Sequence, residues 1–409
     1  MTRTTAVLAF LLLTAAAAVA QPNWQLGKPI VTYWAGPAMT EANAKQMAEG
    51  NFNLVWCQEQ ELDNAQKQGV RALLHNGLIS PAVLADPAKR AELDALIDRV
   101  KNHPAMYAYF IGDEPNSARF PEIGKLFAYL REKDPAHLAY INLFPTYATN
   151  EQLGNQGDVV TAYTEHLKQF VAVVKPQLIS YDHYHFGVGA DGGQYFLNLG
   201  LIRDAALQAG IPFLNIIQAA TWDPGMRIPH TAEVRFLVNT SLAYGAQGVS
   251  YYVYCCGGHL GMLANFDGSP TLLYYGLKHP NRDFAAMATQ LQPLKALGAY
   301  HAGTKAQGAK LLPTDAPFRL DPPVANQEPV TNMPVEGFVL GYFGPQGGQP
   351  THVVVVNLDY GKPAQTTLVG PGNLQTFNPA KCRWTNVGTS RLTLRLQAGG
   401  AALVRLAPR

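Results

Sequence analysis

Two adjacent carboxylic acids followed by a proline form the part of this chain best suited to acid–base chemistry. Asp113, Glu114 and Pro115 come directly after the apolar run 107–111. Pro115 fixes its own φ angle and biases Glu114 toward an extended backbone, which predicts a rigidly held Glu114. A partly buried carboxyl can have a raised pKa and donate a proton. The structural alternative is a carboxylate that caps the next helix near Ser117, although burying two neighbouring carboxylates for stability alone would be costly.

A further carboxylate follows another apolar run, in a segment rich in histidine and tyrosine. Asp182 lies within residues 180–185, Ser-Tyr-Asp-His-Tyr-His, at the end of the run 177–181. An aspartate beside two histidines suits a general base or a nucleophile, and a hydrogen bond to the neighbouring loop is the structural alternative. Glu59 and Asp223 are the next candidates for a second acid.

The histidines of this segment also raise the question of a metal site. His183, His185 and Asp182 all lie on one short loop, and the sequence offers them no distant partner ligands. Bunched spacing of this kind is not typical of a protein metal site. We therefore predict no metal and no other cofactor.

Other residues with rings, amides or imidazoles lie where the remaining apolar runs end. Aromatic rings can stack on the apolar faces of sugars, and Asn, Gln and His side chains can hydrogen-bond to hydroxyl groups. Each such residue alone is more often a packing residue, but together they favour a carbohydrate as the ligand. The predicted binding residues are Asp113, Trp34, Glu59, His75, Asn142, His183, Tyr184, Gln218, Trp222 and Tyr252, with Tyr147 a further candidate.

Short apolar runs alternate with amphipathic stretches from about residue 28 to about residue 297. The runs are typical of buried strands and the periodic stretches of helices. About eight such units predict a parallel sheet closed into a (β/α)8 TIM barrel, whose functional groups lie at the carboxyl ends of the strands. No glycine-rich phosphate loop follows the first run, which disfavours an open doubly wound sheet. The predicted strands are residues 29–34, 53–57, 70–74, 107–111, 137–144, 177–181, 212–217 and 248–254.

The pattern changes after about residue 305, where helical periodicity ends and Pro and Gly become frequent. Short alternating runs follow, and they predict a small antiparallel β-sandwich. The predicted organisation is residues 21–304 as the barrel, 305–334 as a linker and 335–409 as the C-terminal sandwich.

The N-terminus has the features of a secretory signal peptide. Arg3 precedes an apolar run over residues 6–19, and Ala18-Val19-Ala20 forms a small-x-small cleavage site. We predict that residues 1–20 are removed after Ala20 and that the protein is secreted or periplasmic, without a membrane anchor.

The chain has 4 cysteines, which is too few for a disulfide-based scaffold. The neighbours Cys255 and Cys256 could close a vicinal disulfide in an exported protein, or one of them could pair with Cys57. Buried free thiols are the alternative.

The charge balance excludes some partners. The 409 residues carry a formal net charge of +2, and 15% of them are charged. Such a balance provides no electrostatic field to hold nucleic acid or an anionic membrane. We predict a carbohydrate substrate as the partner, no nucleic acid, and make no prediction of oligomeric state.

The segment Asp113-Glu114-Pro115 resembles the Asn-Glu-Pro motif of the large clan of TIM-barrel glycoside hydrolases that includes many β-galactosidases, cellulases and mannanases. The resemblance implies that Glu114 is the acid/base and that Asp113 replaces the sugar-binding Asn. In that clan the nucleophilic Glu follows the seventh strand, where this chain has Gln218, and an amide cannot form a glycosyl ester.

The resemblance implies a secreted glycoside hydrolase that cleaves O-glycosidic bonds by carboxylate acid/base catalysis. Both standard mechanisms need a second acid, about 5–5.5 Å away for retention or about 6.5–9.5 Å away for inversion. Asp182 is the predicted partner of Glu114. A non-catalytic glycan-binding barrel without the second carboxylate is the alternative that Gln218 favours.

Overall fold

A computed structural model of the chain describes residues 23–255, 257–327 and 336–408. The predicted signal peptide and Cys256 lie outside the described residues. The vicinal pair therefore stays a prediction. Cys57 is a buried free thiol. The alternative in which Cys57 pairs with a member of the vicinal pair is therefore wrong.

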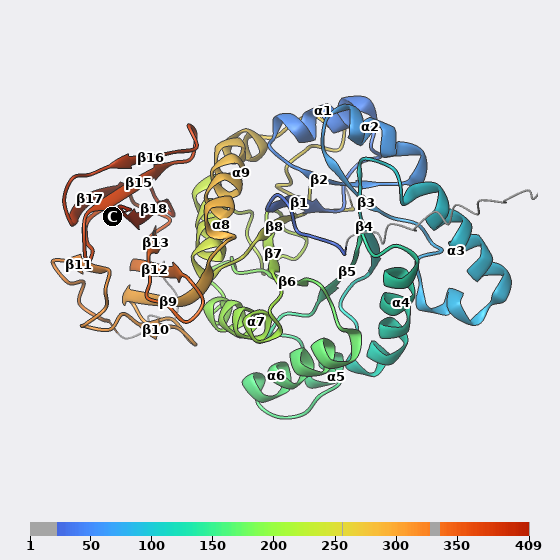
Figure 1. Cartoon of the computed structure of the whole chain (residues 1–409), viewed down its shortest axis with the longest axis horizontal. Helices are drawn as coiled ribbons and strands as arrows, with labels where there is room; N and C mark the ends of the chain where they lie inside the picture. The colour runs from blue at the N-terminus through green and yellow to red at the C-terminus, as the bar shows by residue number, and fades with distance from the viewer. Residues whose placement is uncertain (1–22, 256, 328–335, 409) are drawn as a thin grey trace, which may run out of the picture.

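The first region is a barrel of eight parallel strands, as the sequence predicts (Figure 1). Neighbouring strands pair in the order β1-β8-β7-β6-β5-β4-β3-β2. The strands are β1 Ile30–Trp34, β2 Leu54–Cys57, β3 Arg71–Leu74, β4 Met106–Gly112, β5 Leu138–Leu143, β6 Ile179–His183, β7 Phe213–Gln218 and β8 Gly248–Tyr252.

One asparagine side chain closes the barrel between β1 and β2. The Asn53 backbone N–H donates to the Val31 carbonyl (2.9 Å), and its side-chain oxygen accepts from the Val31 N–H (3.1 Å). Its side-chain amide donates to the carbonyl of Pro29 (2.8 Å). Three hydrogen bonds from one residue thus take the place of a longer ladder between the two strands, whose edges would otherwise be unpaired.

Helices surround the barrel, and local sequence fixes where they begin and end. The Asp86 side chain caps α3, which has Pro87 at its first position. Glycines end two of the helices, since α7 and α8 stop at Gly210 and Gly245, both with a left-handed backbone. The helices are α1 Glu41–Glu49, α2 Leu62–Lys67, α3 Pro87–Val100, α4 Phe120–Lys133, α5 Asn150–Leu153, α6 Val159–Gln169, α7 Tyr195–Ala209, α8 Thr231–Tyr244 and α9 Leu272–Leu291. No described helix is long and apolar enough to cross a membrane.

The second region consists of two β-sheets around their own apolar core, as predicted. All but one of its strand pairs are antiparallel, and β9 and β10 run parallel. The larger sheet has the order β10 (Lys310–Leu311), β9 (Lys295–Gly303), β12 (Gly337–Gly344), β13 (His352–Asn357), β18 (Ala401–Leu406), β15 (Leu374–Asn378) and β16 (Arg383–Asn386). The smaller has β11 (Arg319–Asp321), β14 (Ala364–Val369) and β17 (Arg391–Leu396).

The boundary between the two regions lies earlier than the sequence suggests. β9 pairs with β12 along eight residues and is therefore part of the sandwich, although it falls within the predicted barrel range 21–304. The predicted linker 305–334 also supplies β10 and β11 to the two sheets. Frequent Pro and Gly in this segment hid strands that are only two or three residues long.

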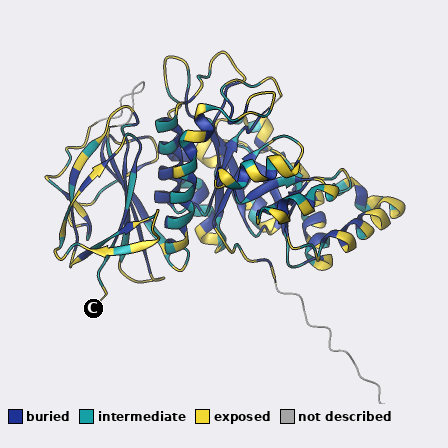
Figure 2. Ribbon diagram, turned by 90° about the horizontal axis from the view of Figure 1, so that it is seen from above, coloured by how far each residue is buried: buried dark blue, intermediate teal, exposed yellow. Residues whose placement is uncertain are grey.

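The sandwich packs against the barrel helices α8 and α9 (Figure 1). Gly341 in β12 allows the close approach, because a Cβ there would lie 2.1 Å from the Ala243 carbonyl oxygen of α8. Arg235 and Asn239 of α8 donate to the carbonyls of Ala398 and Gly399. Buried residues run through both regions and across their junction (Figure 2).

Candidate active site

A cavity of about 460 Å³ opens at the carboxyl ends of the barrel strands. This is the end at which TIM barrels carry their functional groups. Eight of the twelve residues predicted for the site line it. The lining residues are Trp34, Asp113, Glu114, Asn142, Tyr147, Asp182, Tyr184, Trp222, Met226 and Tyr252.

Glu114 stands on a strained backbone at the end of β4. Its φ is 44°, in the left-handed region, so the extended conformation expected from Pro115 is wrong. A non-glycine residue in this region costs free energy that the surrounding structure must offset. The Glu114 N–H donates to the Asn142 carbonyl (3.0 Å), which ties the strained residue to β5. The fold thus holds the Glu114 carboxyl in a fixed direction.

Asn142 at the end of β5 organises the three acids of the cavity. Its side-chain amide donates to Asp113 Oδ1 (3.0 Å) and to Asp182 Oδ1 (2.7 Å). Its side-chain oxygen accepts from the Ser180 hydroxyl (3.1 Å), which fixes the orientation of the amide. Ser180 in turn hydrogen-bonds to the Tyr140 hydroxyl (2.8 Å). Each atom of the Asn142 side-chain amide that can hydrogen-bond therefore has a partner.

The pKa of Glu114 is raised to about 7, first by burial and then by the neighbouring charge of Asp113. A hydrogen bond with Asp182 opposes this rise. Burial and the charge of Glu114 raise the pKa of Asp182, which is only 2% exposed. The hydrogen bond between them lowers the pKa of Glu114 and raises the pKa of Asp182, as expected if a protonated Asp182 donates to an ionised Glu114. The two carboxyls therefore act as one coupled pair that holds a proton near neutral pH.

Asp113 faces the same cavity but differs from the other two acids. Burial raises its pKa, and the hydrogen bond from Asn142 opposes that rise. No described Lys, Arg or His forms an ion pair with Asp113, Glu114 or Asp182. Three acids without a cation can hold at least one proton between them, which suits proton donation.

Aromatic rings form the wall above the acids. Tyr184, Trp222 and Tyr252 come from three different strand ends, and their ring centroids lie 4.7 to 4.9 Å apart. Trp34 lies at the end of β1 and packs edge-on against Trp56 (5.2 Å). Flat rings above polar groups are the arrangement expected of a pocket that binds a sugar ring.

Two of the predicted residues outside the cavity are fully engaged in structural contacts. Gln218 is completely buried, and its amide bonds to the backbone of Phe186 (2.7 and 3.1 Å) and to the Arg227 carbonyl (3.0 Å). The predicted binding role of Gln218 is therefore wrong. His183 is buried and hydrogen-bonds to Asn198 (2.9 Å), and burial lowers its pKa to about 3. It is a neutral core histidine.

Glu59 and His75 also lie away from the cavity. The Glu59 carboxylate forms two hydrogen bonds with Arg99 (2.5 and 3.0 Å), and this contact lowers its pKa. Glu59 is therefore not the second acid. His75 is exposed beyond β3 and lies near the rings of Trp56 and Phe110. Asp223 accepts from the Gly225 N–H (2.6 Å) in a turn and does not line the cavity.

Met226 is the one lining residue that the sequence did not indicate. It lies in the loop after β7, and a lone thioether in a loop carries no recognisable signal. The described residues contain no group of three or more His, Cys, Asp or Glu placed to hold a metal ion.

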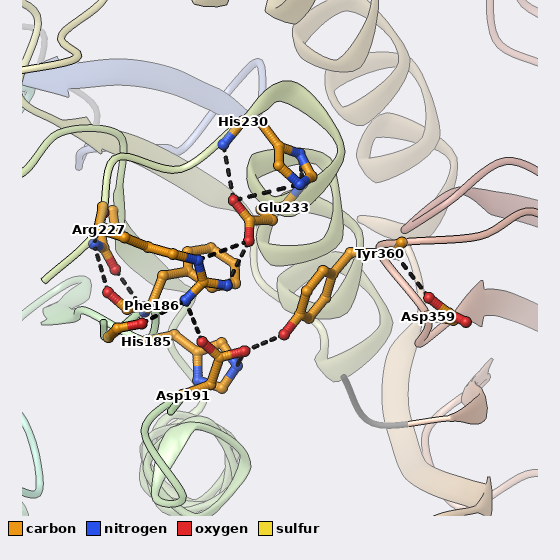
Figure 3. A network of polar contacts seen from close by, with 11 residues as sticks. His185, Phe186, Asp191, Arg227, His230, Glu233, Asp359 and Tyr360 are labelled. Carbon is orange, nitrogen blue, oxygen red and sulfur yellow. Dashed lines mark hydrogen bonds and ion pairs between the residues drawn. The ribbon is translucent and has the colours of Figure 1, made fainter. Parts of the chain in front are cut away.

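Arg227 connects the loops that carry Tyr184 and Trp222, and Figure 3 shows its contacts. Its guanidinium pairs with Asp191 and Glu233 and donates to the Gly187 carbonyl (2.9 Å). Asp191 also accepts from the hydroxyl of Tyr360, which belongs to the sandwich. The network joins the β6–α7 loop, the β7–α8 loop, α8 and the second region.

Comparisons with known proteins support the fold. No protein-family model matches the chain, and no curated protein matches its sequence. A glycoside hydrolase family 5 protein from Bacteroides vulgatus has a similar structure, with a TM-score of 0.56 at 12% identity over 91% of this chain and 88% of that one. A second structure, described as a glycoside hydrolase, has a TM-score of 0.54 at 11% identity over 91% and 90%.

A β-galactosidase from the psychrophilic Marinomonas ef1 matches more distantly, with a TM-score of 0.44 at 12% identity over 64% of this chain. The match covers 60% of that enzyme, less than two thirds of its length. At 11% and 12% identity, the two matches with TM-scores of 0.54 and 0.56 show a fold shared over 91% of this chain. The assignment of chemistry depends on the site itself.

Proposed function

We propose that this protein is a glycoside hydrolase in which Glu114 donates the proton to the leaving oxygen of an O-glycosidic bond. The observation that carries the proposal is the cluster of three acids without a cation at the carboxyl end of the barrel, beneath a wall of aromatic rings. Because the pKa of Glu114 is raised to about 7, much of this carboxyl is protonated near neutral pH. A general acid works best when its pKa lies near the working pH.

The three acids take different roles in this mechanism. Glu114 reaches the cavity and releases the proton, and Asp182 behind it shares a proton with it through their hydrogen bond. Asp113, held by Asn142 and exposed to the cavity, is the carboxylate that balances the positive charge developing on the sugar ring as the bond to the leaving oxygen breaks. Water then forms the new C–O bond at the ring carbon, and its proton passes to the Glu114 carboxylate, which restores the acid. The aromatic wall positions the ring over these groups.

A glycan-binding barrel without catalysis is the second candidate. Gln218 favours it, because the end of β7 carries an amide committed to structural hydrogen bonds where the related clan has its nucleophile. In addition, Asp182 is coupled to Glu114 through a hydrogen bond, whereas both standard mechanisms need a second carboxyl that acts independently of the acid.

Glu114→Gln tests the two candidates against each other. A panel of nitrophenyl glycosides of different sugars and both anomers first identifies a substrate. We expect the variant to lose about 10²- to 10⁴-fold in kcat/KM, the contribution typical of a general acid. Calorimetry with the product sugar should show unchanged binding. Glu122→Gln is the matched control, since Glu122 is half exposed on α4, pairs with Arg119 and does not line the cavity.

Unchanged turnover by Glu114→Gln would contradict the proposal. If the wild-type protein binds sugars and cleaves none of the panel, the glycan-binding candidate replaces it. Export to the periplasm or the medium belongs to the same proposal, because the apolar segment before Ala20 has the features of a cleaved signal peptide. Residue Gln21 would then be the first residue of the mature protein, which mass spectrometry of the exported chain can check.

A further inference from the structure

Four apolar side chains are exposed on three loops beside the cavity. They are Val188 (63% exposed), Trp222 (40%), Ile228 (50%) and Leu260 (58%). Val188 follows β6, Trp222 and Ile228 follow β7, and Leu260 follows β8. We call these four residues the apolar rim. Exposed apolar groups that gather in one place mark a binding surface more often than scattered ones do.

Backbone contacts make the three loops one continuous surface. Gly187 pairs with Met226, and the Val188 N–H donates to the Gly225 carbonyl (2.8 Å). Thr221 and Leu260 exchange two backbone hydrogen bonds of 2.9 and 2.8 Å.

Ile228 reaches the third loop as well. A Cβ on Gly261 would lie 2.2 Å from Ile228 Cγ2, so the isoleucine side chain rests directly on that loop. The three loops that carry the rim residues are therefore neighbours, although they come from separate parts of the chain.

The rim stands on a rigid base. Arg227 immediately precedes Ile228, and its guanidinium is fixed by Asp191 and Glu233 (Figure 3). The buried amide of Gln218 bonds to both sides of the same loop pair. Side chains presented from such a base lose little freedom on binding, which favours a preformed surface.

The chemistry changes sharply between the cavity floor and the rim. The floor has three carboxyls and an amide, which can bind sugar hydroxyls. Val188, Ile228 and Leu260 have no donor or acceptor in their side chains, and hydroxyl groups gain nothing from them. Trp222 belongs to both parts, since it lines the cavity and is exposed at the rim.

We propose that the apolar rim binds the apolar aglycone, an alkyl or aryl group, of a glycoside whose sugar ring occupies the cavity. The inference rests on the proposed glycosidase function and narrows its substrate class. Continuity with the cavity through Trp222 is the argument for this occupant. A molecule with a polar head and an apolar tail matches the order of the two surfaces.

The expected size of the effect follows from the burial of methylene groups. Each methylene that leaves water for an apolar surface favours binding by about fourfold when it is fully buried. On an open rim we expect about half the burial, hence about twofold per methylene. From methyl to octyl glycoside, kcat/KM should therefore rise by about 10²-fold.

The test uses methyl, butyl, hexyl and octyl glycosides of glucose, galactose and mannose, in both anomers and below their micelle concentrations. The triple variant Val188→Ser, Ile228→Ser, Leu260→Ser should flatten the dependence on chain length while methyl glycosides are cleaved as by wild type. The double variant Val173→Ser, Leu207→Ser is the matched control, because it removes exposed aliphatic groups from the helical outside of the barrel. It should leave the dependence unchanged.

Calorimetric titration of Glu114→Gln with the same series measures the rim without turnover. Hydrolysis or binding that is independent of chain length overturns the inference and leaves the proposed function intact. If the wild-type protein cleaves none of these glycosides but binds them more tightly as the chain lengthens, the proposed function is overturned and the inference about the rim is not. Two other results would also overturn the inference, provided that chain length has no effect. Dimerisation that depends on protein concentration and is lost in the triple variant would assign the rim to a second copy of the chain. Binding to phosphatidylcholine vesicles that is lost in the triple variant would assign it to a lipid surface.

Discussion

The loops at the mouth of this barrel hold two clusters of acids that differ in one respect. Among the described residues, the side chains of Asp113, Glu114 and Asp182 have only the Asn142 amide and one another as partners. Asp191 and Glu233, by contrast, share the guanidinium of Arg227. No cation balances the first cluster, which favours the protonated form of its acids, whereas the guanidinium of Arg227 balances the charges of the second.

The difference separates chemistry from support within one face of the fold. Acids with raised pKa values and a strained backbone cost stability and gain a proton that can be released. Acids paired with arginine form short charged hydrogen bonds that fix the loops carrying them. The first cluster faces the cavity, and the second braces the loops that form the wall of the cavity (Figure 3).

Arg227→Met breaks the paired cluster and should have the largest effect on stability. The variant leaves Glu233 (4% exposed) and Asp191 (13% exposed) without their cation. Removing one partner of a buried ion pair costs about 3–5 kcal/mol of unfolding free energy. Urea unfolding at pH 7 measures it, with Arg90→Met on the exposed surface of α3 as the control. A midpoint equal to that of the control would refute the bracing role.

Asp182→Asn sharpens the comparison at the unpaired cluster. If Asp182 is protonated in the resting protein, the amide of an asparagine imitates it and can still donate to Glu114. We expect kcat/KM to fall by less than about tenfold, the equivalent of one ordinary hydrogen bond. A nucleophile or a general base would instead be irreplaceable, so a fall beyond about 10³-fold would show that Asp182 acts as an anion.

Tyr360→Phe should destabilise the protein less than Arg227→Met does, and it tests the link to the sandwich. The change removes one hydroxyl that donates to Asp191 and keeps the ring, which packs against Phe186 and Phe236. Loss of one hydrogen bond to a charged group costs about 1.5–3 kcal/mol, less than the loss of the arginine. Thermal unfolding measures the shift, with Tyr275→Phe as the exposed control. Equal melting temperatures for the two variants would contradict a structural role of the link.

The sequence was most informative where periodicity and rigid residue types coincide. Eight apolar runs predicted the barrel, and the acids after the fourth and sixth runs do line one cavity. The backbone of Glu114 was mispredicted because the bias from Pro115 is local, whereas the hydrogen bond to Asn142 of β5 is not.

Partners chosen by tertiary structure account for the other differences. Gln218 and Glu59 end strands as binding residues do, yet their partners Phe186 and Arg99 come from elements that only the fold brings near. The same holds for the sandwich boundary, because β9 follows α9 closely and gives no sign in sequence that it pairs with β12. Contacts of this kind cannot be derived from spacing along the chain.

The most direct test of the account is the titration of the Glu114 carboxyl itself. Carbon-13 NMR of the protein labelled at glutamate side-chain carboxyls, with Glu114→Gln to assign the signal, follows its protonation without any substrate. We predict a midpoint near pH 7, with Glu114 protonated below it and able to donate a proton, and ionised above it. A midpoint near the ordinary value of 4.5 would show that the cluster does not hold a proton on Glu114 at neutral pH, and it would contradict the proposed general acid.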